Sequence, residues 1–279
     1  MIERYVETQR QRVDGFLSDY LEQRRERATE KLFDAIEYAL ASGKRLRPIL
    51  LLASAEAFHL NAEKMLSTAA AIECFHIYSL IHDDLPAMDN SDFRHGRLST
   101  HKKFDEATAI LAGDTLIPLG FELLAQETAK HFLAKHTLTL IQTVAHVLGS
   151  HGLTGGQLID LDFLQNSDHT SDDLALMYRR KTGALIELSV SAPAILLGQA
   201  RKLERLSRFG RALGLAYQLI DDMLDAAEEA HKPTLLRAWG LEKTRTRAQE
   251  LTDEAIEAIQ PLHSERLEEL ARYLLRRTY

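Results

Sequence analysis

Hydrophobic residues recur every three or four positions along almost the whole chain, which is the spacing of amphipathic helices. Near the start, one such stripe consists of Val13, Phe16, Leu17, Tyr20 and Leu21. The same spacing predicts further helices over residues 32–40, 48–59, 62–83, 105–130, 132–150, 171–181, 184–197, 202–225 and 237–277. No stretch of useful length alternates apolar and polar residues, so no strand is predicted. The pattern predicts an all-α protein with a single domain over residues 1–279.

Two of the predicted helices carry a proline, and two segments are apolar on more than one face. Pro118 and Pro193 each predict a kink or a break. The segments "FELLAQ" (121–126) and "TLTLIQTVAHVLG" (137–149) lack a polar face. Helices of this kind lie at the centre of a protein or in a subunit interface. A homodimer is therefore predicted.

Composition narrows the classes of function. Of the 279 residues 45% are hydrophobic, which is enough for a sizeable buried core. The net charge of −7 argues against a surface that binds nucleic acid or anionic membranes. The lone cysteine, Cys74, excludes an intramolecular disulfide and a thiolate metal site. With no pattern of a signal peptide and no run of about 18 apolar residues, a cytoplasmic protein without stable membrane insertion is expected.

Aspartates gather where the apolar stretch 62–83 ends. Asp83 and Asp84 are adjacent, and Asp89 follows after four residues. Two neighbouring carboxylates repel each other and resist removal from water unless a cation accompanies them. Pro86 predicts that the helix ends here and that the chain bends Asp89 back toward the pair.

A second group of aspartates, Asp221, Asp222 and Asp225, ends the apolar stretch 202–225. Asp221 and Asp225 are four residues apart, so both project from one face of a helix and destabilise it unless a cation bridges them. Oxygen ligands without cysteine favour Mg²⁺, which completes its shell with water and substrate phosphates. The two clusters together predict a magnesium clamp on a diphosphate. The alternative is two solvated acidic helix ends.

Further motifs give these clusters a family context. "GKRLRP" (43–48), "GGQLIDLDF" (155–163) and "KTGALI" (181–186) stand with the two clusters in the order found in polyprenyl diphosphate synthases. The chain resembles the bacterial farnesyl diphosphate synthases, whose first motif likewise has four residues between the aspartate pair and the third aspartate. The resemblance extends over nearly the whole chain. It implies an all-α bundle around a deep central cavity, with the two aspartate motifs facing each other across its mouth.

The resemblance also implies a reaction. Enzymes of this kind condense isopentenyl diphosphate with an allylic diphosphate, dimethylallyl or geranyl, and here the expected product is farnesyl diphosphate. Mg²⁺ helps to ionise the allylic diphosphate, and the resulting cation alkylates the double bond of isopentenyl diphosphate. Concentrated positive charge favours departure of the diphosphate, and an apolar bundle excludes water from the cation.

Roles for individual residues follow from the same resemblance. It implies magnesium ligands at Asp83, Asp84, Asp89, Asp221, Asp222 and Asp225, isopentenyl diphosphate contacts at Lys44, Arg47 and His76, and allylic diphosphate contacts at Arg94, Lys181, Thr182 and Gln218. Asp83, Asp84, Lys181 and Asp221 are the residues expected to be catalytic. Gln157 and Asp160 resemble supporting polar groups, with an internal hydrogen bond as the alternative. The alternative for Lys44 and Arg47 is an exposed basic loop, and for His76 a core histidine.

The length of the product is expected to depend on the helix before the first aspartate cluster. Tyr78 and Ser79 lie five and four residues before Asp83, about one helical turn away. An aromatic residue at this position resembles the pattern of enzymes with fifteen-carbon products. Ordinary core packing is the alternative role for Tyr78.

The chain departs from the family pattern at two places. His95 stands where the family usually has a second arginine after Arg94, which predicts weaker and pH-dependent binding of isopentenyl diphosphate. After Asp225 the family has a longer segment with a first lysine that closes over the diphosphates. Here "HKPTLL" follows quickly, so that Lys232 is retained as a substrate contact while Glu228 and Glu229 add negative charge.

These departures leave other readings open. One is a catalytically weak family member that acts as a binding or regulatory subunit, which the short segment and His95 favour. Another is a terpene cyclase-like enzyme with an altered substrate, against which Lys44, Arg47 and His76 argue because a cyclase has no use for an isopentenyl diphosphate pocket.

Overall fold

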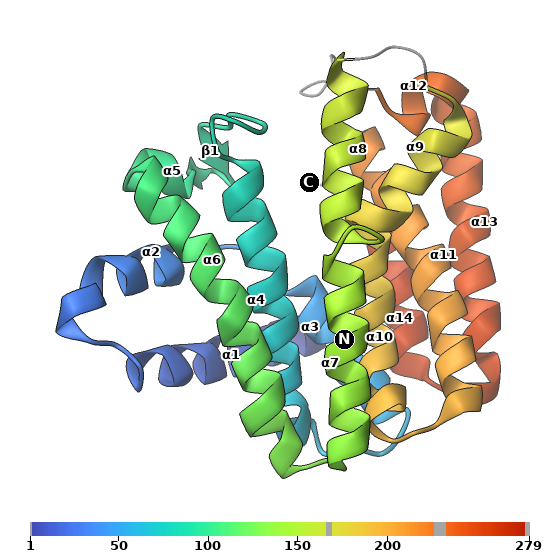
Figure 1. The fold of residues 1–279 in the computed structure, drawn as a ribbon. Helices are drawn as coiled ribbons and strands as arrows, with labels where there is room; N and C mark the ends of the chain where they lie inside the picture. The colour runs from blue at the N-terminus through green and yellow to red at the C-terminus, as the bar shows by residue number, and fades with distance from the viewer. Residues whose placement is uncertain (1, 166–168, 226–232, 277–279) are drawn as a thin grey trace. The chain divides into compact units, whose positions relative to one another are not determined.

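The computed structural model describes residues 2–165, 169–225 and 233–276. These residues form fourteen α-helices joined by short 3₁₀ and π segments (Figure 1), which confirms the all-α prediction. The chain divides into two compact units. The first consists of Glu3–Leu52 and Ala62–Leu133, and the second of Ala53–Asn61 and Ala134–Tyr279. Each unit has its own hydrophobic centre, and each carries one of the aspartate clusters.

The first unit is built around one helix that is apolar on nearly all sides. Its elements are α1 (Ile2–Glu22), η1 (Arg27–Thr29), α2 (Glu30–Leu40), the first half of α3 (Leu46–Glu56), η2 (Ala62–Met65), α4 (Leu66–Asp83), α5 (Thr100–Lys103), α6 (Glu106–Glu122), the π-helix η3 (Leu123–Glu127) and η4 (Thr128–Lys130). Helix α4 is the buried centre, as expected for a helix without a polar face. It packs closely along α6 (Figure 1).

Two glycines of α6 allow this close packing. A Cβ at Gly113 would lie 2.1 Å from Nε2 of His82, and a Cβ at Gly120 would lie 2.5 Å from Cε1 of Phe75. Neither distance is possible for a real side chain, so α6 can approach α4 only where these residues lack one.

The sequence predicted no strand, but the first unit contains a short hairpin. Strands β1 (Phe93–Arg94) and β2 (Arg97–Leu98) are antiparallel, with Arg94 opposite Arg97. His95 and Gly96 form the turn, and both have positive φ (50° and 73°), as a two-residue type I′ turn requires. Strands of two residues are too short to show an alternating pattern, which is why the prediction missed them.

The second unit is built in the same way around α10. Its elements are the second half of α3, α7 (Ala134–Leu148), α8 (Leu153–Gln165), α9 (Ser171–Tyr178), the π-helix η5 (Arg179–Gly183), α10 (Ala184–Leu196), α11 (Ala200–Leu224), α12 (Leu235–Trp239), α13 (Leu241–Ile259), η6 (Gln260–Leu262) and α14 (Glu265–Leu275). Helix α10 is buried on most sides and packs against α7 and α11 (Figure 1).

Two helix predictions for this unit were wrong. The sequence pattern did not identify α8, because its glycines Gly155 and Gly156 are poor helix formers. The single helix predicted over 237–277 is divided into three helices. Gly240, with φ of 80°, separates α12 from α13, and the 3₁₀ turn with Pro261 separates α13 from α14. Pro118 and Pro193 lie inside helices that continue past them.

One helical run, Glu106–Lys130, is long and apolar enough to cross a membrane by length and composition alone. In its most apolar window 44% of the residues are buried inside the protein. Core helices of soluble proteins pass the same test, so this finding is weak evidence for a span. The expectation of no stable membrane insertion stays a prediction.

Gly120→Ala should destabilise the protein, because the added methyl group would overlap the ring of Phe75. Overpacking of this kind costs about 1–3 kcal/mol of unfolding free energy. Gly15→Ala is the matched control, since a Cβ at this exposed position of α1 meets nothing within 4 Å. The control should stabilise the protein by about 0.5–1 kcal/mol. Urea unfolding followed by circular dichroism measures both effects, and a Gly120→Ala variant as stable as the wild type would contradict the packing argument.

Candidate active site

The first aspartate cluster lies where α4 ends. The side chains of Asp83 and Asp84 are almost removed from solvent, with exposed fractions of 8% and 2%. Beyond them the chain turns back on the helix, because the N–H of Asp89 donates to the carbonyl of Asp83 (2.9 Å) and the N–H of Ser91 to that of Asp84 (3.2 Å). The bend expected at Pro86 is therefore present, and it returns Asp89 to the helix end.

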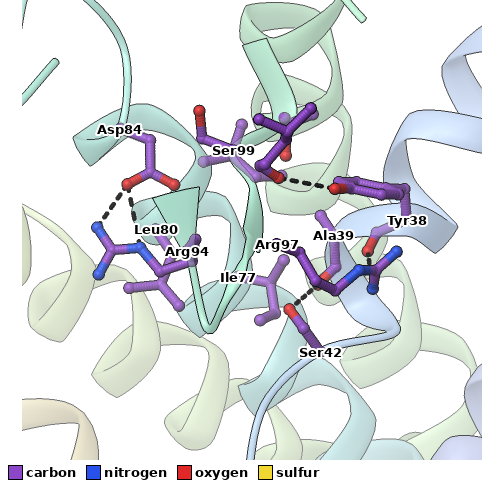
Figure 2. A pocket seen from close by; sticks show the side chains of 12 residues that line it. Tyr38, Ala39, Ser42, Ile77, Leu80, Asp84, Arg94, Arg97 and Ser99 are labelled. Carbon is purple, nitrogen blue, oxygen red and sulfur yellow. Dashed lines mark hydrogen bonds and ion pairs between the residues drawn. The ribbon is translucent and has the colours of Figure 1, made fainter. Parts of the chain in front are cut away.

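The buried carboxylate of Asp84 is paired with Arg94 of the hairpin. The Nε of Arg94 donates to Oδ1 of Asp84 at 3.0 Å, and Nη2 donates to the same oxygen (Figure 2). Burial raises the pKa of Asp84, while the hydrogen bonds and charge of Arg94 oppose this shift. Arg94 thus provides the positive charge that a carboxylate so far from water requires.

A pocket of about 20 Å³ lies beside this ion pair and is large enough for about one water molecule (Figure 2). On the other side of this pocket, two hydrogen bonds connect the hairpin to α2. The hydroxyl of Tyr38 donates to the carbonyl of Leu98 (2.7 Å), and Nη1 of Arg97 donates to the carbonyl of Tyr38 (3.3 Å). These bonds fix the hairpin, and with it the position of Arg94.

The basic segment 43–48 is anchored by Arg45, which sequence reasoning had not singled out. Arg45 has a positive φ of 53° and a side chain only 4% exposed. Its Nε donates to Asp14 (2.7 Å), and its Nη1 donates to the buried Glu73 of α4 (2.8 Å). Removing one partner of such a buried pair leaves an uncompensated charge. We therefore assign Arg45 and Glu73 a positioning role for the neighbouring Lys44 and Arg47.

Arg47 and His76, which the sequence predicted to act together, are in contact. Nη1 of Arg47 lies 3.0 Å from Nε2 of His76. A guanidinium can only donate, so Nε2 accepts and the imidazole is neutral. Burial, and next the charge of Arg47, lower the pKa of His76 well below its ordinary value. His76 lies one helical turn after Glu73 on α4, so both arginines are held by the same helix.

His95 lies at the tip of the hairpin, between basic groups. Its Nδ1 is 3.5 Å from the hydroxyl oxygen of Ser42. Burial, followed by the charges of Arg94 and Lys44, lowers the pKa of His95. A neutral ring therefore occupies the position at which the resemblance led us to expect a second arginine.

Tyr78 and Ser79 are both buried within α4. The ring of Tyr78 packs edge-on against that of His82, with centroids 5.9 Å apart. The hydroxyl of Ser79 donates to the carbonyl of His76 in the preceding turn (2.7 Å). The hydroxyl of Ser79 is therefore used by its own helix, whereas Tyr78 contributes a bulky ring.

In the second unit, one face of α11 carries Gly210, Gly214, Gln218 and Asp222 at intervals of four residues. A Cβ at Gly214 would lie 2.8 Å from Cα of Gly183. At Gly210 it would lie 2.5 Å from a Cα of α10. The two glycines let α11 lie directly against η5 and α10, which brings Gln218 and Asp222 within reach of side chains on those elements.

A chain of hydrogen bonds crosses this contact. The hydroxyl of Thr182 donates to Oε1 of Gln218 (2.8 Å), and Nε2 of Gln218 donates to Oδ1 of Asp222 (3.2 Å). The hydroxyl of Tyr178 donates to the other carboxylate oxygen of Asp222 at 2.6 Å. Asp222 is 5% exposed, and its two oxygens accept separate bonds. The network holds Asp222 in one orientation.

Lys181 is held beside this network by α8. Its Nζ forms an ion pair with Oδ2 of Asp160 at 2.6 Å. Gly156 makes this possible, because a Cβ there would lie 2.4 Å from the backbone nitrogen of Lys181. The neighbouring Gln157 is 6% exposed, and neither atom of its amide has a hydrogen-bond partner among the described residues. A buried amide in this state is suited to bind a ligand or a water molecule.

Asp221 and Asp225 end α11 and are less buried than Asp222. The N–H of Asp225 donates to the carbonyl of Asp221, so both belong to the last helical turn. Lys232, Glu228 and Glu229 lie outside the described residues, and their predicted roles stay predictions.

Each aspartate cluster supplies some, but not all, of the ligands that a magnesium ion requires. Within residues 2–165, 169–225 and 233–276, no group of three or more histidine, cysteine, aspartate or glutamate side chains is arranged to hold a metal ion. Mg²⁺ does not need such a group, because it binds through one or two carboxylates, water and substrate phosphates. Both clusters offer carboxylates of the kind that Mg²⁺ binds.

Sequence reasoning missed several residues that shape the site. Tyr178, Glu73 and Arg45 were not named, since nothing in their local pattern shows the partners they reach. The spacing of Gly210 and Gly214, four residues apart on one helix face, is a signal of close helix packing that could have been used.

Comparison with known proteins places these features in a wider context. The model of the family described as "Polyprenyl synthetase" matches residues 29–237. The dimethylallyltranstransferase of Fischerella ambigua is 41% identical, over 94% of this chain and 84% of its own length. The farnesyl diphosphate synthase of Escherichia coli is 38% identical, over 86% of each chain. The crystal structure of an FPP/GFPP synthase from Zymomonas mobilis is similar with a TM-score of 0.90 and 37% identity, covering 99% of this chain and 100% of the other.

The free energy of unfolding should fall when the pH is lowered below about 6.5, because unfolded His76 takes up a proton that the folded protein excludes. The contribution of one such group reaches about 1.4 kcal/mol per pH unit. His76→Gln should reduce this slope, whereas the same change at the exposed His131 should not. Urea unfolding between pH 5 and pH 8, as a range about the ordinary pKa of histidine, measures the slopes. Equal slopes in wild type and His76→Gln would contradict a neutral His76.

Proposed function

Since this chain belongs to the polyprenyl synthetase family, and is thus an enzyme of the prenyltransferase type, we propose that it is a short-chain trans-prenyltransferase. The proposed reaction condenses isopentenyl diphosphate with dimethylallyl or geranyl diphosphate to give farnesyl diphosphate. The observation that carries the proposal is the hydrogen-bonded chain Thr182–Gln218–Asp222, with Lys181 as its neighbour. It joins two residues of the proposed allylic diphosphate site, Thr182 and Gln218, to a proposed magnesium ligand, Asp222.

We propose that Mg²⁺ is held by Asp83, Asp84 and Asp89 and by Asp221, Asp222 and Asp225. When bound, it supplies positive charge that stabilises the departing diphosphate. The acidic side chains of this chain then have distinct tasks. Asp222 is fixed by Tyr178 and Gln218, so its carboxylate oxygens have a defined orientation. Asp221 and Asp225 are less buried, so a metal ion that arrives from solvent can reach their carboxylates.

The basic residues serve the diphosphates. Arg47 offers a planar fork and Lys44 a mobile point charge, and the two stand on either side of the anchored Arg45. His76 stays neutral and holds the guanidinium of Arg47 by accepting from it. Arg94 balances Asp84. Arg94 would also lie within reach of a diphosphate oxygen if a bound cation shared the charge of Asp84.

His95 is proposed to reduce the affinity for isopentenyl diphosphate. A neutral imidazole lacks the second charge and the bidentate geometry of an arginine. A catalytically weak protein that serves as a binding or regulatory subunit is the second candidate function, and His95 is the observation that favours it. A homodimer and a cytoplasmic location stay predictions.

The names of the relatives leave the product open, since they include a farnesyl diphosphate synthase and an FPP/GFPP synthase. We propose the fifteen-carbon product because Tyr78 provides a bulky ring about one turn before Asp83. The ring is buried and packs edge-on against the ring of His82.

Asp83→Ala and Asp221→Ala should each lower the turnover of labelled isopentenyl diphosphate with geranyl diphosphate by more than about a hundredfold, because charge on the departing diphosphate is then unbalanced. Asp92→Ala is the control, since its exposed carboxylate pairs with Lys102 and should not be required. Chelation of Mg²⁺ should abolish the wild-type reaction. A folded wild-type protein that forms no product with either allylic diphosphate, but copurifies with an active synthase, would favour the subunit function instead.

Tyr78→Ala should lengthen the product, because truncation opens space beside α4. Tyr78→Phe, which keeps the ring, should leave the product length as in the wild type. Chromatography of the dephosphorylated products distinguishes fifteen from twenty or more carbons, counted in five-carbon units. The same product distribution in the wild type and in Tyr78→Ala would exclude Tyr78 as the determinant of chain length.

A further inference from the structure

The second unit contains a cavity of about 540 Å³, and none of the proposed substrate contacts that the structure describes line it. Helices α7, α10 and α11 form its walls, with the π-helix η5 at one end. The volume lies within the range of about 300–1,000 Å³ that is typical of small-molecule sites.

Three side-chain contacts mark successive positions along the length of the cavity. At one end Arg211 of α11 pairs with Glu187 of α10 (2.8 Å). In the middle, the hydroxyls of Ser191 and Ser207 lie 3.3 Å apart. Just beyond the far end, Nδ1 of His136 on α7 lies 3.0 Å from the carbonyl oxygen of Leu196, the residue after Ile195. The cavity therefore follows α10 from Glu187 to Ile195, a distance of about 12 Å.

The end at Glu187 is strongly basic. Arg179, Arg180 and Arg211 line it, and Glu187 is the one acidic residue among the described residues that line the cavity. In the part of the chain that the structure describes, neither Arg179 nor Arg180 forms an ion pair. His146 and His151 stack here with ring centroids 5.2 Å apart. So much uncompensated positive charge, in a protein with a net charge of −7, favours an anion.

The rest of the cavity is apolar. Leu188 and Ile195 of α10 and Leu203 of α11 line it, together with small hydroxyl side chains. A free inorganic anion would leave this part unused. A hydrocarbon chain would remove the apolar surfaces from water, at about 25 cal/mol for each Å² buried.

The position of Lys181 separates this cavity from the proposed active site. Lys181 turns toward Asp160 of α8, whereas the preceding Arg180 lines the cavity. Consecutive helical residues project in different directions, so one segment serves two sites.

We propose that this cavity is a second ligand site, which binds a phosphate ester with a short hydrocarbon chain. The phosphate contacts Arg180 and Arg211, and the chain lies along Leu188 toward Ile195. The inference concerns binding alone and does not depend on the proposed reaction. Two sources share this chemistry, an isoprenoid phosphate and a single-chain phospholipid.

Decyl phosphate is the first probe, added in the presence of a chelator so that metal-dependent binding does not contribute. The Cε1–H signals of His146 and His151, assigned with His146→Gln and His151→Gln, report on this cavity alone. Both signals should shift and reach saturation. Inorganic phosphate and decanol should each bind at least about tenfold more weakly, because each lacks one half of the recognition. Equal binding of inorganic phosphate would overturn the assignment of the apolar part.

Arg180→Gln and Arg211→Gln should each weaken binding roughly tenfold, as expected for the loss of one charge-assisted hydrogen bond. Arg208→Gln is the matched control, because this exposed arginine of α11 does not line the cavity. Lys44→Gln should also leave the histidine shifts unchanged. Circular dichroism confirms that each variant is folded. Saturation without any change in Arg180→Gln and Arg211→Gln, or no saturable shift in the wild type, would overturn the site.

Geranyl phosphate and lysophosphatidic acid then distinguish the two sources. Tighter binding of geranyl phosphate, lost in Arg180→Gln, supports the site with an isoprenoid ligand. Tighter binding of lysophosphatidic acid, with the same loss, supports it with a lipid ligand.

Discussion

A carboxylate that is almost removed from water must be neutralised or hydrogen-bonded, and this requirement organises both units. Asp84 and Asp222 are 2% and 5% exposed. The first unit meets the requirement with a charge, the guanidinium of Arg94. In the second unit, the phenol of Tyr178 and the amide of Gln218 donate to the two oxygens of Asp222. The hairpin is fixed where Arg94 can reach α4, and α11 is fixed where Asp222 can reach Tyr178.

Such short bonds between helices depend on how closely the backbones approach. Gly183 and Gly214 face each other where η5 meets α11, and Gly156 faces the backbone of Lys181. With any side chain at these positions the helices would move apart by more than the tolerance of a hydrogen bond. The glycines therefore determine the polar geometry of the site, although they contribute no polar side chain themselves. In the first unit, Gly113 and Gly120 have the same relation to α4.

The periodicity of hydrophobic residues predicted those features that belong to a single helix. It gave most of the helices and the apolar character of α4. The motifs placed Arg47 and His76 in one predicted site, and the two side chains are in contact. Contacts between elements could not be derived in this way. Tyr178 binds Asp222, which is 44 residues away in the sequence, and Arg45 binds Glu73, which is 28 residues away. A hydrophobic pattern shows which face of a helix is buried, but it does not show which other element packs against that face. The hairpin and the glycine-containing α8 were missed because local propensity was weak or the element was short.

The π-helix η5 has a consequence for how relatives of this chain are compared. A π-turn holds one residue more than an α-turn, so the register of α9 before it and that of α10 after it are offset. An alignment that removes one residue within Arg179–Gly183 would still match the apolar positions of one helix, but it would shift those of the other by about 100°. Substitution patterns read through this turn would then place Arg180 in the column of Lys181, and a residue that lines the cavity would be compared with one that pairs with Asp160.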